Sequence, residues 1–201
     1  VAPPARGGEV RAGEGVGSFR NAPERRFTES AERERFAGAI ERVRGELGRD
    51  YPLLLHGREL YTKEWITSIN PARPSELVGR VASADERDAE TAVKSALAAF
   101  PAWRDVPVGE RAGLMFRAAV RLSERRDEFA AWEIFEAGKT WREADADVCE
   151  AIDFLEYYSR EALRLGAGRC MDAPGEANEM FYQPRGVYAI IPPWNFPLAI
   201  L

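Results

Sequence analysis

The sequence has few of the residues that most often carry chemistry in small proteins. Its 201 residues include two cysteines and one histidine. Cys149 and Cys170 are too few for a disulfide framework and lack the Cys-x-x-Cys spacing of metal or redox sites. Cys149 falls within a helical pattern, so we expect a packing residue. His56 has no acidic or cysteine partner placed for catalysis, and we expect it in a solvent-facing turn. We predict no metal site.

Long apolar runs and a surplus of basic charge are also absent. No run approaches the ~20 residues that a membrane-spanning helix needs, and the start VAPPARGGEVRAGEG lacks the apolar core of a secretory signal. The 28 basic residues, three of them lysine, are outnumbered by 33 acidic residues and mixed with them. Nucleic-acid-binding surfaces are basic. We therefore exclude nucleic acid and membrane as partners and expect a cytoplasmic protein.

Hydrophobic spacing is strong, and it predicts a helix-rich first part of the chain. Residues 1–20 are rich in Gly, Pro and Ala without periodicity, which indicates a flexible arm. Short β-prone runs between residues 51 and 83, broken by Gly, Pro and Asn, indicate strands joined by tight turns. Apolar residues at three- and four-residue spacing predict helices near residues 29–47, 84–100, 108–124, 127–138 and 141–165.

Capping and breaking residues set the expected helix ends. Ser83 with Glu86, and Thr140 with Glu143, have the spacing of capping boxes. Pro101 is expected to end the helix that begins after Ser83, because proline disrupts a helix interior. The predicted buried stripe of that helix consists of Ala89, Val93, Ala96, Leu97 and Phe100.

The end of the chain has a different pattern. EMFYQP is typical of an exposed strand, whereas GVYAII is continuously apolar. A continuous apolar run is expected of a strand buried on both faces of a parallel sheet. We therefore predict a strand over residues 187–191 and an α/β fold.

Several stretches together resemble a known family. NPARPSELVGRVASADERDAETAVKSALAAFPAW, EAGKT and RGVYAIIPPWNFP are similar, in the same order, to the aldehyde dehydrogenase superfamily. SFRNAPERRF, YPLLLHGRE, DVCEAIDFLEYYSREA and PGEANEMFYQPRGV resemble its 1-pyrroline-5-carboxylate dehydrogenase branch. The resemblance covers nearly everything from Ser18 to Leu201.

The resemblance implies the amino-terminal part of the aldehyde dehydrogenase fold, incomplete in this chain. Residues 21–168 are then the helical part of the NAD-binding domain with short strands. Residues 169–185 correspond to oligomerisation strands. Residues 186–201 begin a Rossmann-like sheet and carry the active-site loop.

The resemblance also implies site residues around PPWNFP. Asn195 corresponds to the amide that stabilises the oxyanion formed from the aldehyde, which requires preorganised donors. Glu136 in EAGKT faces the ammonium group of the substrate, Phe196 walls the aldehyde tunnel, and Lys139 is expected to be a helix-end charge. The residues that line the cofactor NAD are Ile191, Pro192, Pro193 and Trp194.

Members of the branch oxidise L-glutamate γ-semialdehyde to L-glutamate during proline degradation. The family's nucleophilic cysteine, general-base glutamate and ribose-binding lysine follow the PWNFP motif, so we expect a truncated chain that is inactive alone and a homo-oligomer when full length. Three alternatives stay open. They are another aldehyde dehydrogenase, the dehydrogenase part of a two-domain proline-utilisation enzyme, and a natural non-catalytic short form that acts in assembly.

Overall fold

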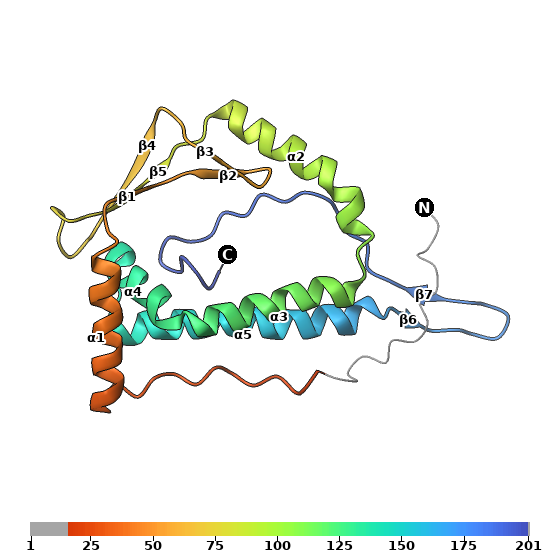
Figure 1. Cartoon of the computed structure of the whole chain (residues 1–201). Helices are drawn as coiled ribbons and strands as arrows, with labels where there is room; N and C mark the ends of the chain where they lie inside the picture. The colour runs from red at the N-terminus through yellow and green to blue at the C-terminus, as the bar shows by residue number, and fades with distance from the viewer. Residues whose placement is uncertain (1–15, 201) are drawn as a thin grey trace.

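Helices are the main regular structure of residues 16–200, the part of the chain that the computed structural model describes (Figure 1). Helices α3 and α5 run side by side, and α1 and α4 pack at one end of this pair. All five predicted helices are confirmed within the described residues. Their bounds are Ser30–Arg44 for α1, Glu86–Arg104 for α2, Val108–Glu124 for α3, Arg126–Ala137 for α4 and Trp141–Gly166 for α5.

The helix starts show one confirmed and one wrong capping prediction. Thr140 and Glu143 form the predicted box of α5, with the Glu143 carboxylate accepting from the Thr140 N–H at 3.0 Å. The box of α2 is formed by Asp85 and Asp88, whose side chains each accept from the other's backbone N–H, and not by Ser83 and Glu86. Ser83 lies two residues before the N-cap position, and its N–H extends the sheet by donating to the Glu64 carbonyl at 2.9 Å.

Two further predictions for α2 are wrong. The helix continues through Pro101 to Arg104, because a proline near the end removes only one hydrogen bond from a helix that is already formed. No residue of α2 is buried, and Val93 and Leu97 of the predicted buried stripe are 49% and 54% exposed. Among residues 16–200, the neighbours of this helix leave its apolar side largely exposed.

The strands are short and lie mainly between α1 and α2. One sheet has the order β1-β5-β4, with β1 (Arg49–Tyr51) parallel to β5 (Leu77–Ala82) and β4 (Trp65–Ile69) antiparallel to it. Strands β2 (Leu53–Leu55) and β3 (Arg58–Leu60) form a hairpin. A third, exposed pair joins β6 (Arg169–Cys170) to β7 (Glu179–Met180) and projects from the helices (Figure 1).

His56 and Gly57 form the β2–β3 turn. Both have positive φ, 54° and 70°, as hairpin turns of two residues require. His56 is exposed, and its Nδ1 lies 2.7 Å from the Ser95 hydroxyl of α2. The prediction of a solvent-facing turn residue is confirmed.

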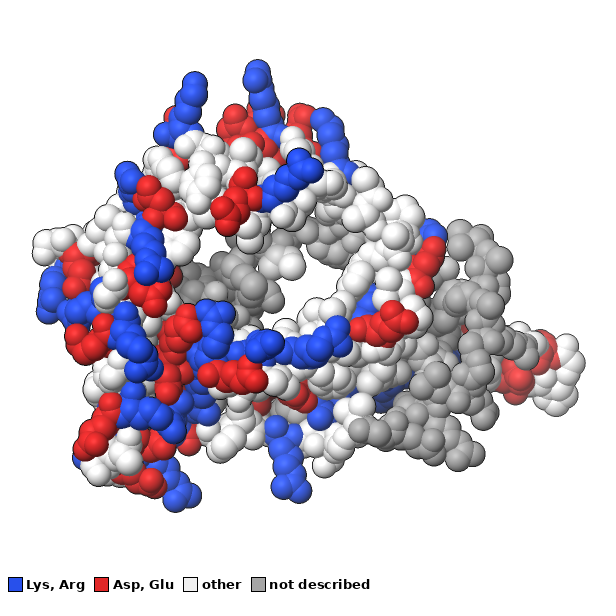
Figure 2. All heavy atoms as spheres, viewed as in Figure 1, with Lys and Arg blue, Asp and Glu red and all other residues white. Residues whose placement is uncertain are grey.

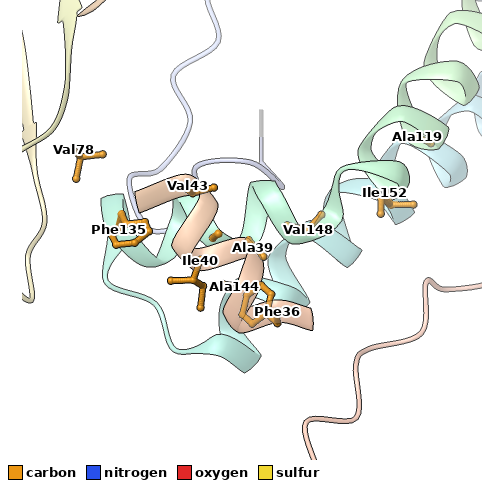
Figure 3. Packing of buried hydrophobic residues seen from close by; sticks show 12 residues of the cluster. Phe36, Ala39, Ile40, Val43, Val78, Ala119, Phe135, Ala144, Val148 and Ile152 are labelled. Carbon is orange, nitrogen blue, oxygen red and sulfur yellow. The ribbon is translucent and has the colours of Figure 1, made fainter. Parts of the chain in front are cut away.

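The hydrophobic core lies where α1, α4 and α5 meet, next to β5 and α3 (Figure 3). Phe36 and Val43 of α1 face Phe135 of α4 and Val148 of α5, and each is at most 2% exposed. Burial of side chains of this size contributes about 1.5–3 kcal/mol each. The core therefore fixes α1 on the α4–α5 pair.

An extended segment precedes α1 and lies along α5. The backbone N–H of Ala22 donates to Asp153 at 2.7 Å, and that of Arg25 donates to Asp145 at 2.9 Å. Asp145 is 1% exposed and also accepts two hydrogen bonds, of 2.7 and 2.6 Å, from the Arg126 guanidinium. A buried carboxylate needs such partners, so Asp145 fixes this segment and α4 to α5.

The predicted arm, residues 1–20, lies mostly outside the described residues. Residues 16–20 are described and have no regular secondary structure. Arg160 of α5 donates from Nε to the Gly17 carbonyl at 3.0 Å, and the rings of Phe19 and Tyr157 pack edge to face with centroids 5.4 Å apart. Residues 16–20 therefore continue along α5, as residues 21–25 do.

The predicted strand over residues 187–191 is wrong. These residues form no strand, and Tyr188, Ile190 and Ile191 are 68%, 71% and 90% exposed (Figure 1, dark blue). A strand is held by hydrogen bonds to its neighbours, and residues 16–200 supply none here. The sheets that do form give a mixed α/β structure in which β1 and β5 are the parallel pair.

Charge is distributed without segregation over the face in Figure 2, where acidic and basic side chains lie intermixed. Many of them pair with each other, as Arg80 does with Asp50 at 2.7 Å. Among the described residues, no helix combines the length and apolar character that crossing a membrane requires.

Candidate active-site loop

The PPWNFP stretch forms a tight turn. The Phe196 N–H donates to the Pro193 carbonyl at 3.2 Å, which places Trp194 and Asn195 at the two corners. Pro193 and Pro197 flank the corners and fix their own φ angles. Trp194 is 84% exposed and Asn195 is exposed, and within residues 16–200 no group hydrogen-bonds to the Asn195 side chain. The turn therefore presents an amide that is free to bind a ligand.

The chain turns into the protein directly after Asn195. The Phe196 ring lies over the Lys139 ammonium, 5.3 Å from Nζ to the ring centroid. Leu198 packs against the hydrophobic core, and Ala199 is 5% exposed. The loop is thus exposed up to Asn195 and held by the helical part from Phe196 onward.

Lys139 is a member of a buried charged cluster. Its Nζ lies 2.8 Å from the Glu133 carboxylate of α4 and 2.8 Å from the Asp147 carboxylate of α5. The side chains of Glu133, Lys139 and Asp147 are 5%, 12% and 1% exposed. Lys139 is a charge at the end of α4, as predicted, but its side chain lies between the carboxylates of α4 and α5 and not in solvent. We call these three residues the acid–lysine cluster.

Burial changes the protonation of this cluster. Burial and a hydrogen bond with Asp147 raise the pKa of Glu133 to about 8, although the Lys139 ammonium acts in the opposite direction. Burial lowers the pKa of Lys139, but hydrogen bonds to Asp147 and Glu133 outweigh this and the pKa is raised overall. Lys139 therefore stays charged at neutral pH, and Glu133 holds a proton there.

Glu136 lies one turn from the cluster, near the end of α4. It is exposed and forms no ion pair within the described residues, so its carboxylate is available to a cationic ligand. Gly138 follows with φ of 67°, the left-handed conformation that ends many helices. Glu136 is thus exposed at the end of α4, and Lys139, in the linker after Gly138, turns inward.

A pocket of about 370 Å³ lies between α1, the Asn70 loop and the α4–α5 junction. Lys139, Trp141 and Asn70 line it. The residues of the PPWNFP turn do not line this pocket, so it is separate from the exposed amide of Asn195.

The cysteines do not contribute to the loop. Cys149 is buried on α5, and burial raises the pKa of its thiol to about 11. Its Sγ lies 3.9 Å from the Pro23 carbonyl, and its prediction as a packing residue is confirmed. Cys170 is exposed in β6. Residues 16–200 also hold no group of three His, Cys, Asp or Glu side chains placed to bind a metal ion.

Sequence reasoning singled out the PPWNFP stretch and Glu136 as site candidates, and their roles stay predictions, but it missed the acid–lysine cluster. One signal was available. Asp147 shares a helix face with Ala144, Val148 and Ala151, all of which are buried, so an acidic residue at this position requires a cationic partner.

Comparison of this sequence with known protein families identifies the class of protein to which the five helices and the PPWNFP turn belong. Residues 59–201 match the aldehyde dehydrogenase family. The chain therefore belongs to that family.

Individual relatives narrow the comparison. The chain is 50% identical over 187 residues to 1-pyrroline-5-carboxylate dehydrogenase of Geobacillus kaustophilus, with 92% of this chain and 36% of the relative covered. The structure of 1-pyrroline-5-carboxylate dehydrogenase from Thermus with bound NAD matches with a TM-score of 0.88 and 46% identity, over 92% of this chain and 36% of that one. Proline utilization A from Bdellovibrio bacteriovorus matches with a TM-score of 0.88 and 35% identity, and the match covers 91% of this chain and 19% of that one. The chain thus spans about a third of the length of the dehydrogenases it resembles.

Proposed function

We propose that this chain is the amino-terminal part of an NAD-dependent dehydrogenase that oxidises L-glutamate γ-semialdehyde to L-glutamate. The observation that carries the proposal is the Asn195 amide, which is exposed and has no hydrogen-bond partner within residues 16–200. It lies on a turn that is flanked by prolines and held by the core from Phe196 onward. The similarity to named 1-pyrroline-5-carboxylate dehydrogenases supports the choice of branch.

In this proposal Asn195 acts on the aldehyde oxygen. As that oxygen gains negative charge, the side-chain N–H of Asn195 donates to it, and a neutral amide can do so without losing a proton. Because the turn is closed by the Phe196–Pro193 hydrogen bond, the donor is oriented before substrate binds. The residues of this chain bind and orient, and none of them is assigned as nucleophile or general base.

The exposed apolar residues before Asn195 fit one wall of a site for NAD. Ile191 and Trp194 are 90% and 84% exposed, and Pro192 and Pro193 separate them in an extended stretch. Flat apolar surfaces of this kind suit the ring systems of a dinucleotide. When bound, NAD supplies the hydride acceptor for the oxidation.

Glu136 is proposed to recognise the amino group of the substrate. Its carboxylate is exposed and without an ionic partner among residues 16–200. A charge-assisted hydrogen bond between carboxylate and ammonium is stronger than a neutral one. Phe196, one face of which is occupied by Lys139, is proposed to border the aldehyde carbon chain.

A hybrid enzyme tests the role of Asn195. Residues 16–201 replace the matching part of the Geobacillus kaustophilus dehydrogenase, and NADH formation is followed by rapid mixing. We expect Asn195→Ala to lower the rate of hydride transfer by ~10²- to 10³-fold with little change in NAD affinity, because the amide is needed only as charge develops. Glu34→Ala, on the exposed side of α1, is the control and leaves the rate unchanged. Unaltered hydride transfer in a folded Asn195→Ala hybrid contradicts the assignment.

The same hybrid tests Glu136. Glu136→Gln keeps the shape and removes the charge, so kcat/KM for glutamate semialdehyde is expected to fall about 10-fold or more, as loss of a charged hydrogen bond predicts. The value for a simple aliphatic aldehyde is expected to stay near that of the parent. Glu34→Gln, on exposed α1, is the control. Equal losses on both aldehydes exclude a recognition role.

A second candidate is suggested by the β6–β7 hairpin, which is exposed throughout. Its sequence resembles the family's oligomerisation strands, so we propose self-association through it, either in a full-length homo-oligomer or in a non-catalytic form. Light scattering of the chain with and without Met180→Lys distinguishes the two, because an assembly module self-associates without the rest of an enzyme. The match to proline utilization A also keeps a two-domain enzyme among the candidates.

A further inference from the structure

The contact between Lys139 and Phe196 joins the PPWNFP turn to the helical core. The ammonium lies 5.3 Å from the centroid of the Phe196 ring and 2.8 Å from each carboxylate of the acid–lysine cluster. Glu133 belongs to α4, Asp147 to α5 and Lys139 to the linker between them. Three segments of the helical core and the loop therefore meet at one charged group.

The choice of lysine at this position is informative. The chain uses arginine at 25 of its 28 basic positions, since three are lysine (28 − 3). Lys139 is the one lysine whose side chain is largely shielded from solvent, at 12% exposed. An ammonium is a compact charge with three donors, whereas a guanidinium is a planar fork. The ammonium can face two carboxylates and still approach the face of an aromatic ring. A lysine at position 139 can therefore contact both carboxylates and the ring at once, which the planar guanidinium of an arginine cannot do as well.

Exposure changes sharply along the loop at the point where Lys139 makes its contact. Ile191 and Trp194 before Asn195 are almost fully exposed, and Ala199 after it is 5% exposed. Phe196 is the first residue after Asn195, so its contact with Lys139 is the first attachment of the loop to the core.

We propose that Lys139 is a positioning residue, which, held by Glu133 and Asp147, fixes the Phe196 ring and thereby the orientation of the Trp194–Asn195 turn. In this proposal, only the catalytic role of Asn195 rests on the proposed function. The positioning itself is a property of this chain and can be measured in it.

Lysine resonances report the contact directly. With ¹³C-labelled lysine the chain gives three ε-methylene signals, from Lys63, Lys94 and Lys139. An aromatic ring shifts nuclei that lie over its face upfield, so the Lys139 signal is expected apart from the other two. We expect Phe196→Leu to move it toward them and Phe196→Tyr to restore it. A Lys139 signal that does not respond to Phe196→Leu overturns the proposal.

Amide hydrogen exchange reports the consequence for the loop. Loss of a partly desolvated cation–π contact is expected to speed exchange at Phe196, Leu198 and Ala199 about 10-fold. Both Lys139→Met and Phe196→Leu should do this, and Lys94→Met, on exposed α2, should not. If Lys139→Met lowers only the global stability, or if the variant does not fold, the exchange rates of Phe196→Leu still decide whether the contact positions the loop. This substitution leaves the acid–lysine cluster intact.

Two outcomes separate this proposal from the proposed function. Unchanged loop exchange in Phe196→Leu shows that Lys139 has a purely structural role, even if the hybrid enzyme is active and depends on Asn195. A shifted lysine signal and faster loop exchange support positioning, even if the hybrid enzyme oxidises no aldehyde.

Discussion

Glu133 carries a carboxyl group that is 5% exposed and faces both Lys139 and Asp147. Its pKa of about 8, raised first by burial and then by Asp147, means that the folded chain holds a proton there at neutral pH. In the unfolded chain the same group titrates near its ordinary value of 4.5. The two states therefore bind different numbers of protons across a pH range that includes neutrality.

The stability of the chain is expected to fall with rising pH through this range. Because the folded-state pKa is the higher one, the stabilising contribution is complete below about 4.5 and is lost as pH rises through about 8. Glu133→Gln keeps the hydrogen-bonding shape and cannot ionise, so its stability should fall less than that of the parent between pH 5 and 9. Urea unfolding at several pH values measures the difference. Parallel curves for the two proteins contradict the assignment.

The environment of a single residue could be predicted where it depends on nearby residues in the sequence. His56 followed from a turn pattern and Cys149 from a helical stripe, and both predictions are confirmed. Lys139 was not predictable in this way, because its partners lie 6 residues before it on α4 and 8 residues after it on α5. A pairing across a helix–helix junction has no local sequence pattern.

The α4–α5 junction depends on the conformation of one glycine. Gly138 has φ of 67°, and a Cβ atom added there would lie 2.9 Å from Cγ of Pro71. A non-glycine residue in the left-handed region costs about 1–2 kcal/mol, and the contact with Pro71 adds to this. Gly138→Ala is therefore expected to lower the free energy of unfolding by at least ~1 kcal/mol, as measured by urea titration.

Gly109 provides the opposite test with the same substitution. It lies in the first turn of α3, and an added Cβ atom would meet nothing within 4 Å. Because glycine destabilises a helix by ~0.5–1 kcal/mol relative to alanine, Gly109→Ala is expected to stabilise the chain. If both substitutions change the free energy of unfolding in the same direction, the left-handed conformation of Gly138 is not the cause of the destabilisation by Gly138→Ala.

Helices were predicted well, and the strand at the end of the chain was not. The period of 3.6 residues and the Thr140–Glu143 box are local, so α5 could be located from sequence. A continuous apolar run such as residues 187–191 shows that these side chains favour burial, but a strand forms only where a neighbouring strand is present. The apolar side of α2 was misjudged for the same reason, since its pattern contains no information about what covers it.

The chain alone is expected to show no aldehyde oxidation. Attack on an aldehyde needs a thiolate aligned with the oxyanion donor. Cys149 is buried with a pKa of about 11, and Cys170 lies on the projecting β6–β7 hairpin. The assay is NADH formation from glutamate semialdehyde with purified chain. Activity that disappears in Cys149→Ser or Cys170→Ser would show that the proposed division of catalytic groups is wrong.

The docking of residues 16–28 on α5 has a consequence for how the chain is made. Ala22 and Arg25 bond to Asp153 and Asp145, which are 131 and 120 residues later in the sequence. On the ribosome these early residues emerge long before α5, and contacts so distant in sequence form slowly because a large loop must close. Until then Phe27, which packs against Phe36 of α1 and Trp141 of α5 in the folded chain, lacks the second of these partners. Nascent chains that end before Asp145 should therefore be better targets for chaperones than chains that include α5.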